Sequence, residues 1–200
     1  MKKLIFLVSC ISLLIVSCNT DFNKSISQVE YSDLIFKDDV GYYGDKPYTG
    51  KVVVYHENGN KRYETNFVNG IDHGVFREWD DQGNLIEKSH MVSGKLEGKF
   101  IRFYPNGQKL FEGNYEKGEV QGKAFQWHEN GQLKIEYHYD NGVEDGIYIF
   151  YNEQGKEILK GEILQGKRDG TWYEYNELLG KSVINIYENG EVIKSTIQSE

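Results

Sequence analysis

Histidine is the side chain best suited to bind metal ions or to move protons near neutral pH, and this sequence has five. His56 and His128 lie three 24-residue periods apart, and His90 and His138 lie two periods apart, whereas His73 has no such mate. If each period adds two strands to a sheet, the sheet grows by about 9.5 Å per period. The paired histidines would then lie roughly 29 and 19 Å apart, far beyond a metal–histidine bond of about 2 Å. We therefore expect no metal site and no cofactor.

Carboxylates recur at what should be the tips of hairpins: Glu57, Asp81, Glu129, Glu153 and Glu177. The paired acids of glycoside hydrolases lie about 5–9.5 Å apart, and neighbouring tips reach only the upper edge of that range. The sequence also lacks a recognisable nucleophile with its base, and its glycines do not form a phosphate-binding loop. We predict that the protein is not an enzyme. A binding surface at the tips would use His56, Glu57, Tyr104, His128, Glu129 and Glu153.

Glycines and aromatic residues recur every 24 residues. The leading glycines are Gly50, Gly74, Gly98, Gly122, Gly146 and Gly170. Five residues after each of them comes an aromatic residue: Tyr55, Trp79, Phe103, Trp127, Tyr151 and Tyr175. A fixed period of this kind is typical of a repeat protein. It predicts six tandem units over residues 50–195, followed by a short tail at residues 196–200.

Each unit has the pattern of a β-hairpin, as the third unit illustrates. Residues 99–103 should form a strand, and residues 104–107 (Tyr-Pro-Asn-Gly) a turn with proline and glycine at favoured positions. Residues 109–115 should form the return strand, with Phe111, Gly113 and Tyr115 on one face because side chains alternate. A single hairpin is only marginally stable, so stacked units must support one another.

The faces of these strands remain ambiguous. Phe100 and Phe103 lie three residues apart, which in a flat strand would place them on opposite faces. Either both faces are used or the strand bends near its glycine. If the aromatic row faces inward, Trp127 should be buried, and its replacement by alanine should cost about 3–5 kcal/mol.

Two segments carry a resemblance to a known family. Residues 145–151 (Asp-Gly-Ile-Tyr-Ile-Phe-Tyr) and 55–59 (Tyr-His-Glu-Asn-Gly) resemble MORN repeats, and more closely the bacterial MORN-variant proteins labelled YwqK-family antitoxins. Residues 41–51 are similar to the entry segment of that family, which implies a capping segment at residues 29–49. The resemblance implies an all-β fold, an elongated antiparallel sheet of tandem 24-residue MORN-like hairpins.

The N-terminus has the pattern of an export signal. Lys2 and Lys3 precede an apolar stretch at residues 4–16, too short for an ordinary transmembrane helix. Residues 15–18 (Ile-Val-Ser-Cys) resemble a lipobox, which implies cleavage of a signal peptide at residues 1–17 and acylation of Cys18. Cys10 follows a similar motif, but its apolar stretch is shorter; an ordinary secretory signal is the other alternative. Residues 18–28 would hold the lipidated cysteine and a flexible tether.

The net charge of −8 would become −10 on loss of a leader with two lysines and no acid. An acidic protein repels phosphate backbones, so we expect no nucleic-acid partner. These features favour a non-enzymatic binding or scaffolding lipoprotein of the bacterial cell envelope. Its partners would be the membrane, through the lipid, and a protein or glycan ligand. The alternative is an antitoxin or immunity-type protein that neutralises a toxin by direct binding. The oligomeric state is left open.

Overall fold

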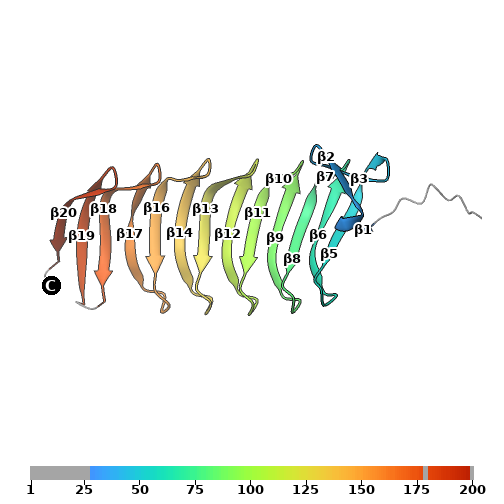
Figure 1. Ribbon diagram of the computed structural model, residues 1–200. Coiled ribbons are helices and arrows are strands. Elements are labelled where there is room, and N and C mark those ends of the chain that lie inside the picture. The colour runs from blue at the N-terminus through green and yellow to red at the C-terminus, as the bar shows by residue number, and fades with distance from the viewer. Residues whose placement is uncertain (1–27, 178–179, 199–200) are drawn as a thin grey trace, which may run out of the picture.

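The computed structural model describes residues 28–177 and 180–198. Most of them belong to one long sheet of 17 strands, and three more strands form a small second sheet. The hairpins follow one another in chain order along a single axis, which makes the molecule elongated (Figure 1). The predicted all-β sheet of tandem hairpins is confirmed. The predicted signal peptide, including Cys18, lies outside the described residues.

Six hairpins, each made of two long antiparallel strands, form the body of the sheet. They pair β5 (Gly50–Tyr55) with β6 (Lys61–Val68), β8 (Gly74–Trp79) with β9 (Leu85–Val92), β11 (Gly98–Phe103) with β12 (Lys109–Glu116), β13 (Glu119–Trp127) with β14 (Leu133–Asp140), β16 (Gly146–Tyr151) with β17 (Glu157–Leu164), and β18 (Lys167–Asn176) with β19 (Lys181–Glu188). Two-residue strands β7 (Ile71–Asp72), β10 (Lys95–Leu96) and β15 (Val143–Glu144) begin some of the later units. A further strand, β20 (Glu191–Ile197), pairs with β19 and takes in residues 196–197 of the expected tail.

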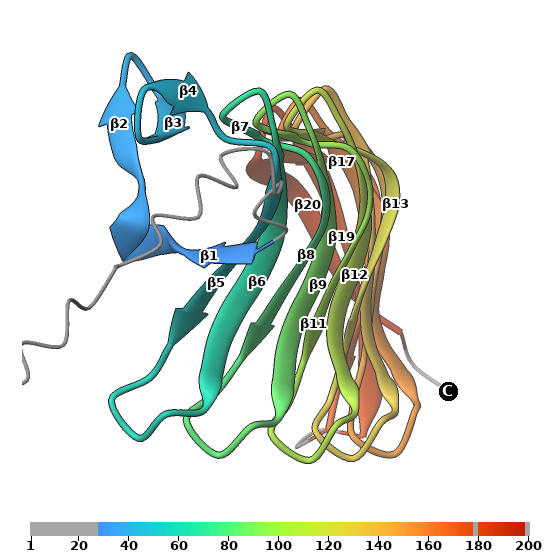
Figure 2. The ribbon, with the colours of Figure 1, turned by 90° about the vertical axis from the view of Figure 1, so that its right-hand side faces the viewer.

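The N-terminal residues cover one end of this sheet. β1 (Gln28–Glu30) pairs with β5 in parallel and is followed by the short 3-10 helix η1 (Tyr31–Asp33). β2 (Ile35–Lys37), β3 (Val40–Tyr43) and β4 (Lys46–Pro47) form the small sheet. Val29, Leu34 and Tyr48 from this segment form a buried cluster with Val52 and Phe67 of the first hairpin. The strands of the long sheet bow, and this segment lies on the concave side (Figure 2).

Two-residue turns connect each hairpin to the next. In Lys117-Gly118 both residues have positive φ, the type I′ pattern that suits tight antiparallel connections. The Gly118 N–H donates to the Leu96 carbonyl at 2.9 Å, and the Lys117 N–H donates to the Glu97 carboxylate at 2.9 Å. The preceding unit therefore satisfies both donors of the turn, which ties each unit to its neighbour. The glycines of the equivalent turns make the same backbone bond: Gly70, Gly94, Gly142, Gly166 and Gly190.

From Gly74 onward, each leading glycine lies where the register shifts between consecutive hairpins, and Gly122 shows this bulge clearly. Gly122 has φ +73°, a conformation that few other residues adopt without strain. Asn114 lies opposite Gln121 and Glu112 lies opposite Phe125, so residues 122–124 together face Gly113. Such a bulge bends and twists the strand. It explains why glycine recurs every 24 residues.

The bulge and the alternation of side chains together decide the two faces. Phe100 contacts Phe111 and Tyr115, with ring centroids 6.0 and 5.4 Å away, on the concave face. Ile101 and Phe103 alternate with it and lie on the convex face. Both possibilities left open by the sequence therefore hold: the strand bends at its glycine, and both faces carry aromatic residues.

Candidate functional site

The concave face forms the core of this one-layer sheet. Its central cross-strand pairs combine a larger side chain with a smaller one, for example Phe100 with Gly113 and Ala124 with Tyr137. Trp172 is only 1% exposed, and its ring lies so close to Gly161 that a Cβ there would come within 2.2 Å of it. Complementary sizes let the side chains interlock without a second layer. The concave face therefore mainly stabilises the fold.

Trp127 belongs to the other face. It is half-buried rather than buried, and its ring contacts Phe125 on the convex side, with centroids 6.0 Å apart. The expectation of a fully buried Trp127 is therefore wrong. The register shifts between Gln126 and Trp127, at the end of the strand next to the hairpin turn. The Trp127 ring at this tip is therefore partly exposed to solvent.

The residues expected to bind a ligand at the hairpin tips hold neighbouring hairpins together. His56 Nε2 lies 2.9 Å from the Trp79 carbonyl, and His128 Nε2 lies 2.8 Å from the Tyr151 carbonyl. The Tyr104 hydroxyl donates to the Trp127 carbonyl at 2.8 Å in the same way. These three side chains occupy equivalent positions and link each turn to the next hairpin. The structure therefore gives them a structural role.

The acids at the tips lie on the outside of the turns. Glu57, Glu129 and Glu153 are exposed. The main-chain carbonyls of Glu129 and Glu153 accept hydrogen bonds from Asn106 and Asn130 of the preceding hairpins, both at 2.9 Å. Their backbones thus join the tip ladder, while their carboxylates extend into solvent.

Of the other three histidines, His90 is exposed and two make local contacts. His73 Nδ1 accepts from the Ser93 N–H at 3.4 Å, and His138 Nδ1 lies 2.8 Å from the Asp145 carbonyl. No three metal-binding side chains converge anywhere in residues 28–177 and 180–198. The same residues contain no helix long and apolar enough to cross a membrane.

The convex face carries ion pairs within and between neighbouring strands. Lys99 Nζ lies 2.6 Å from one oxygen of Glu112, and Lys109 Nζ lies 2.5 Å from the other. One unit later, Lys123 Nζ lies 2.6 Å from Glu136. Burial raises the pKa of Glu112, but the two lysines outweigh that effect and hold the pKa below its usual value. The hydrogen bond to Glu136 raises the pKa of Lys123.

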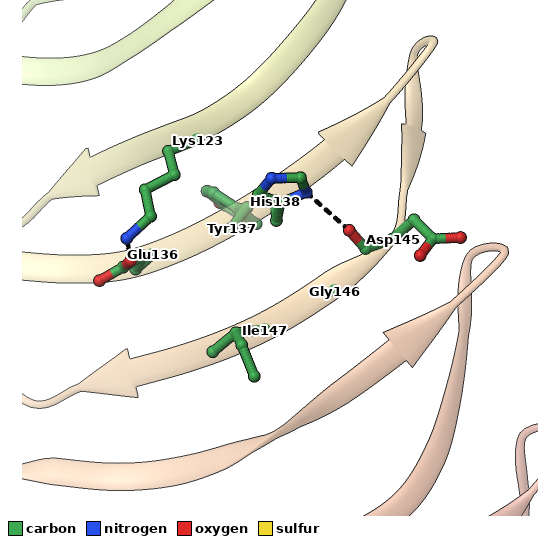
Figure 3. Close-up of a pocket in the computed structure, with 7 residues that line it drawn as sticks. All are labelled: Lys123, Glu136, Tyr137, His138, Asp145, Gly146 and Ile147. Carbon is green, nitrogen blue, oxygen red and sulfur yellow. Dashed lines mark hydrogen bonds and ion pairs between the residues drawn. The ribbon is translucent and has the colours of Figure 1, made fainter.

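Two adjoining depressions lie on this face, at consecutive junctions between hairpins. The larger has a volume of about 470 Å³ and is lined by Lys123, Glu136, Tyr137, His138, Asp145, Gly146 and Ile147 (Figure 3). The smaller, of about 350 Å³, is lined by Lys99, Glu112, Gly113, Asn114, Gln121, Gly122, Lys123 and Phe125. Lys123 lines both depressions, and most of the other lining residues are 24-residue equivalents. We refer to the two depressions together as the convex trough.

The larger depression combines polar and apolar groups. Figure 3 shows the Lys123–Glu136 pair on one side and the His138 imidazole turned toward the Asp145 main chain. Nδ1 of His138 donates to that carbonyl, so Nε2 remains available for a further hydrogen bond. Ile147, which is 49% exposed, supplies an apolar patch. This arrangement can hydrogen-bond and pack against a ligand, but it offers no nucleophile with a base to activate it.

Sequence reasoning missed the lysines and acids of the convex trough. Lys51, Lys99 and Lys123 share one repeat position, and a glutamate follows each of them 13 residues later. On a hairpin, that spacing places the two side chains on one face of neighbouring strands. The periodic lysines and glutamates could therefore have revealed the site.

The first four hairpins match a known family of repeats. The MORN repeat variant family matches at residues 48–69, 72–92, 96–117 and 120–141. These four segments are therefore similar to MORN-variant repeats. No curated protein matches the chain. The smaller depression lies between the third and fourth MORN-variant repeats, and the larger joins the fourth repeat to the fifth hairpin.

Proposed function

We propose that the protein is a non-enzymatic lipoprotein of the bacterial cell envelope that binds an extended ligand along the convex face of its repeats. The observation that carries this proposal is the pair of adjoining depressions that share Lys123. A ligand with a regular chemical repeat could make equivalent contacts in both. Repeat arrays commonly bind through such extended surfaces.

Attachment to the membrane rests on the N-terminal sequence. The apolar stretch ends in the Ile15-Val16-Ser17-Cys18 motif, and the chain beyond it has no other cysteine. Acylation would account for this single thiol. Two or more acyl chains hold a protein stably on a bilayer, at about 0.8 kcal/mol per buried CH₂.

Mass spectrometry of the protein extracted from its native membrane tests this attachment. We expect a lipid-modified N-terminal peptide that begins at Cys18. An unmodified mature N-terminus at Asn19 would refute the anchor. The Cys18→Ala variant serves as the control and should lose acylation.

Site-specific photo-crosslinking in the native envelope tests the binding surface. A benzophenone amino acid at Ile147, in the trough, should capture the ligand. The same group at Val192, in β20, should not, although Val192 is 51% exposed and thus as accessible. Equal capture at both positions, or none at Ile147, would refute the proposed surface. One protease-sensitive adduct of defined mass would instead favour the alternative function, neutralisation of a toxin.

A further inference from the structure

Most charged groups of the convex trough are paired with one another. Lys99 and Lys109 neutralise Glu112, and Lys123 pairs with Glu136. Asp145, which accepts from Gln165, forms no ion pair among the described residues. These three lysines and three acids sum to zero charge, and a strongly charged ligand would have to compete with the ion pairs. The trough therefore favours a ligand without net charge.

The same groups keep much of their hydrogen-bonding capacity. An ammonium group has three donors and a carboxylate about four acceptor sites, so one ion pair leaves most of both unused. Among the described residues, Asn114 makes no side-chain hydrogen bond, and its amide offers both donors and acceptors. Mixed donors and acceptors of this kind suit hydroxyl groups, which both donate and accept.

Apolar groups lie between these polar ones. Phe125 lines the smaller depression and Ile147 the larger. An aromatic or aliphatic surface packs against the apolar face of a sugar ring, while the ring hydroxyls reach the polar side chains around it. Such alternation of polar and apolar groups matches a carbohydrate better than a wholly polar or wholly apolar ligand.

The spacing of the depressions adds a constraint. Consecutive units are about 9.5 Å apart because each adds two strands. In a β-1,4-linked glycan the sugar rings alternate in orientation, so a given group recurs at every second ring. Two linked hexose rings cover a length close to one unit of the sheet, which would let equivalent hydroxyls meet Lys99 and Lys123.

We propose that the convex trough binds a neutral, extended β-1,4-linked glycan, with one disaccharide per hairpin repeat. This inference rests on the proposed function and names the ligand class of the same surface. Lys123 has the central position because it lines both depressions. The acidic charge of the whole chain disfavours an anionic polymer such as a nucleic acid as a competing ligand.

Calorimetric titration of the full-length protein in detergent with chitohexaose, a neutral hexamer of N-acetylglucosamine, tests this inference. We expect binding that is tighter than for the disaccharide and insensitive to salt, because screening acts only between charges. Lys123→Ala should weaken binding by about tenfold, as expected for the loss of a hydrogen bond to a charged group. The matched control, Lys88→Ala, removes an exposed lysine of the same face outside the trough and should change nothing.

The possible outcomes distinguish an error in the assigned ligand class from an error in the assigned binding surface. Failure of chitohexaose to bind, or equal binding by the Lys123→Ala and wild-type proteins, would overturn the inference. Loss of binding in Tyr115→Phe, a change on the concave face, would also overturn it. If Ile147 captures a partner in the native envelope and chitohexaose does not bind, the proposed function stands and only the glycan assignment falls.

Discussion

The two faces of the sheet are built from the same strands, yet they affect carboxylates in opposite ways. On the concave face, burial raises the pKa of Asp72 and Glu87. On the convex face, burial also acts on Glu64 and Glu112, but neighbouring lysines outweigh it and the pKa of both is lowered. The concave face therefore disfavours charge, and the convex face accommodates it.

The difference shows how a one-layer sheet can be stable without a second layer. Interlocked apolar side chains on the concave face exclude water from one another, and the N-terminal segment covers only the first hairpin. The convex face carries the lysine–glutamate ion pairs as well as aromatic residues. Stability thus rests mainly on the concave face, while the binding that we propose would use the convex face, so changes on each face should differ in kind.

The largest loss of stability should follow replacement of Trp172, and Trp127 on the opposite face provides the comparison. Trp172→Ala should cost about 3–5 kcal/mol, because it empties a fully buried aromatic site on the concave face. Trp127→Ala should cost about 1–2 kcal/mol, because only part of that side chain leaves water on folding. Chemical denaturation of both variants measures the difference. Equal costs would mean that the convex face contributes as much core as the concave face.

Two glycines at equivalent positions should respond differently to alanine. Gly161→Ala should cost about 1–3 kcal/mol, because the new Cβ would overlap the Trp172 ring. Gly113→Ala should cost less than about 1 kcal/mol, because the nearest atoms, at 3.1 and 3.2 Å, belong to the Phe111 ring, which can shift slightly, and the Ala124 Cβ at 3.5 Å is an ordinary contact. Thermal unfolding of the two glycine-to-alanine variants tests whether the Trp172 ring leaves no room for a side chain at position 161.

The opposite pKa shifts predict opposite pH dependences. The raised folded pKa of Glu87 means that its contribution to stability is greatest below the unfolded value of 4.5 and is lost as pH rises through the folded pKa. Glu87→Gln should therefore gain stability relative to wild type above about pH 4.5. The lowered pKa of Glu112 stabilises the fold above pH 4.5, and this contribution is lost as pH falls through the folded pKa.

Glu112→Gln should accordingly be less stable than wild type at pH 7, by about 1 kcal/mol or less, and the deficit should shrink below about pH 4.5. Denaturation midpoints of both variants and the wild type between pH 3 and pH 8, on the order of one point per pH unit, give the two curves. Curves of the same sign would contradict the assignment of the two carboxylates to different environments.

The smallest effect concerns two hydroxyls of the concave face. Thr65 donates to the Asp72 carboxylate, whereas the buried Ser89 Oγ, one unit later, has no partner among the described residues. The reason is that Leu96 replaces the aspartate in that unit. Thr65→Val should cost about 1 kcal/mol, and Ser89→Ala should be neutral or stabilising by up to about 1 kcal/mol. Destabilisation by Ser89→Ala would show that its hydroxyl is satisfied.

Much of the fold could be predicted from local patterns. The third hairpin was expected at residues 99–103 and 109–115, and the strands run from Gly98 to Phe103 and from Lys109 to Glu116. The turn at residues 104–107 was also expected, and there the Gly107 N–H donates to the Tyr104 carbonyl at 2.9 Å. The candidate site could not be predicted as well. The roles of His56 and His128 depend on a carbonyl in the next hairpin, and a sequence does not specify that distance.

The sequence by itself determined the period, the strands and the turns, because glycine conformations and alternating side chains act over a few residues. Only the tertiary structure decided which face forms the core and which residues meet. The bulge at Gly122 sets three residues opposite Gly113 and so shifts the register between the third and fourth hairpins. Lys123 pairs with Glu136 within the fourth hairpin, and it also lines both depressions. Each depression lies where two consecutive hairpins meet, so no single repeat contains either one.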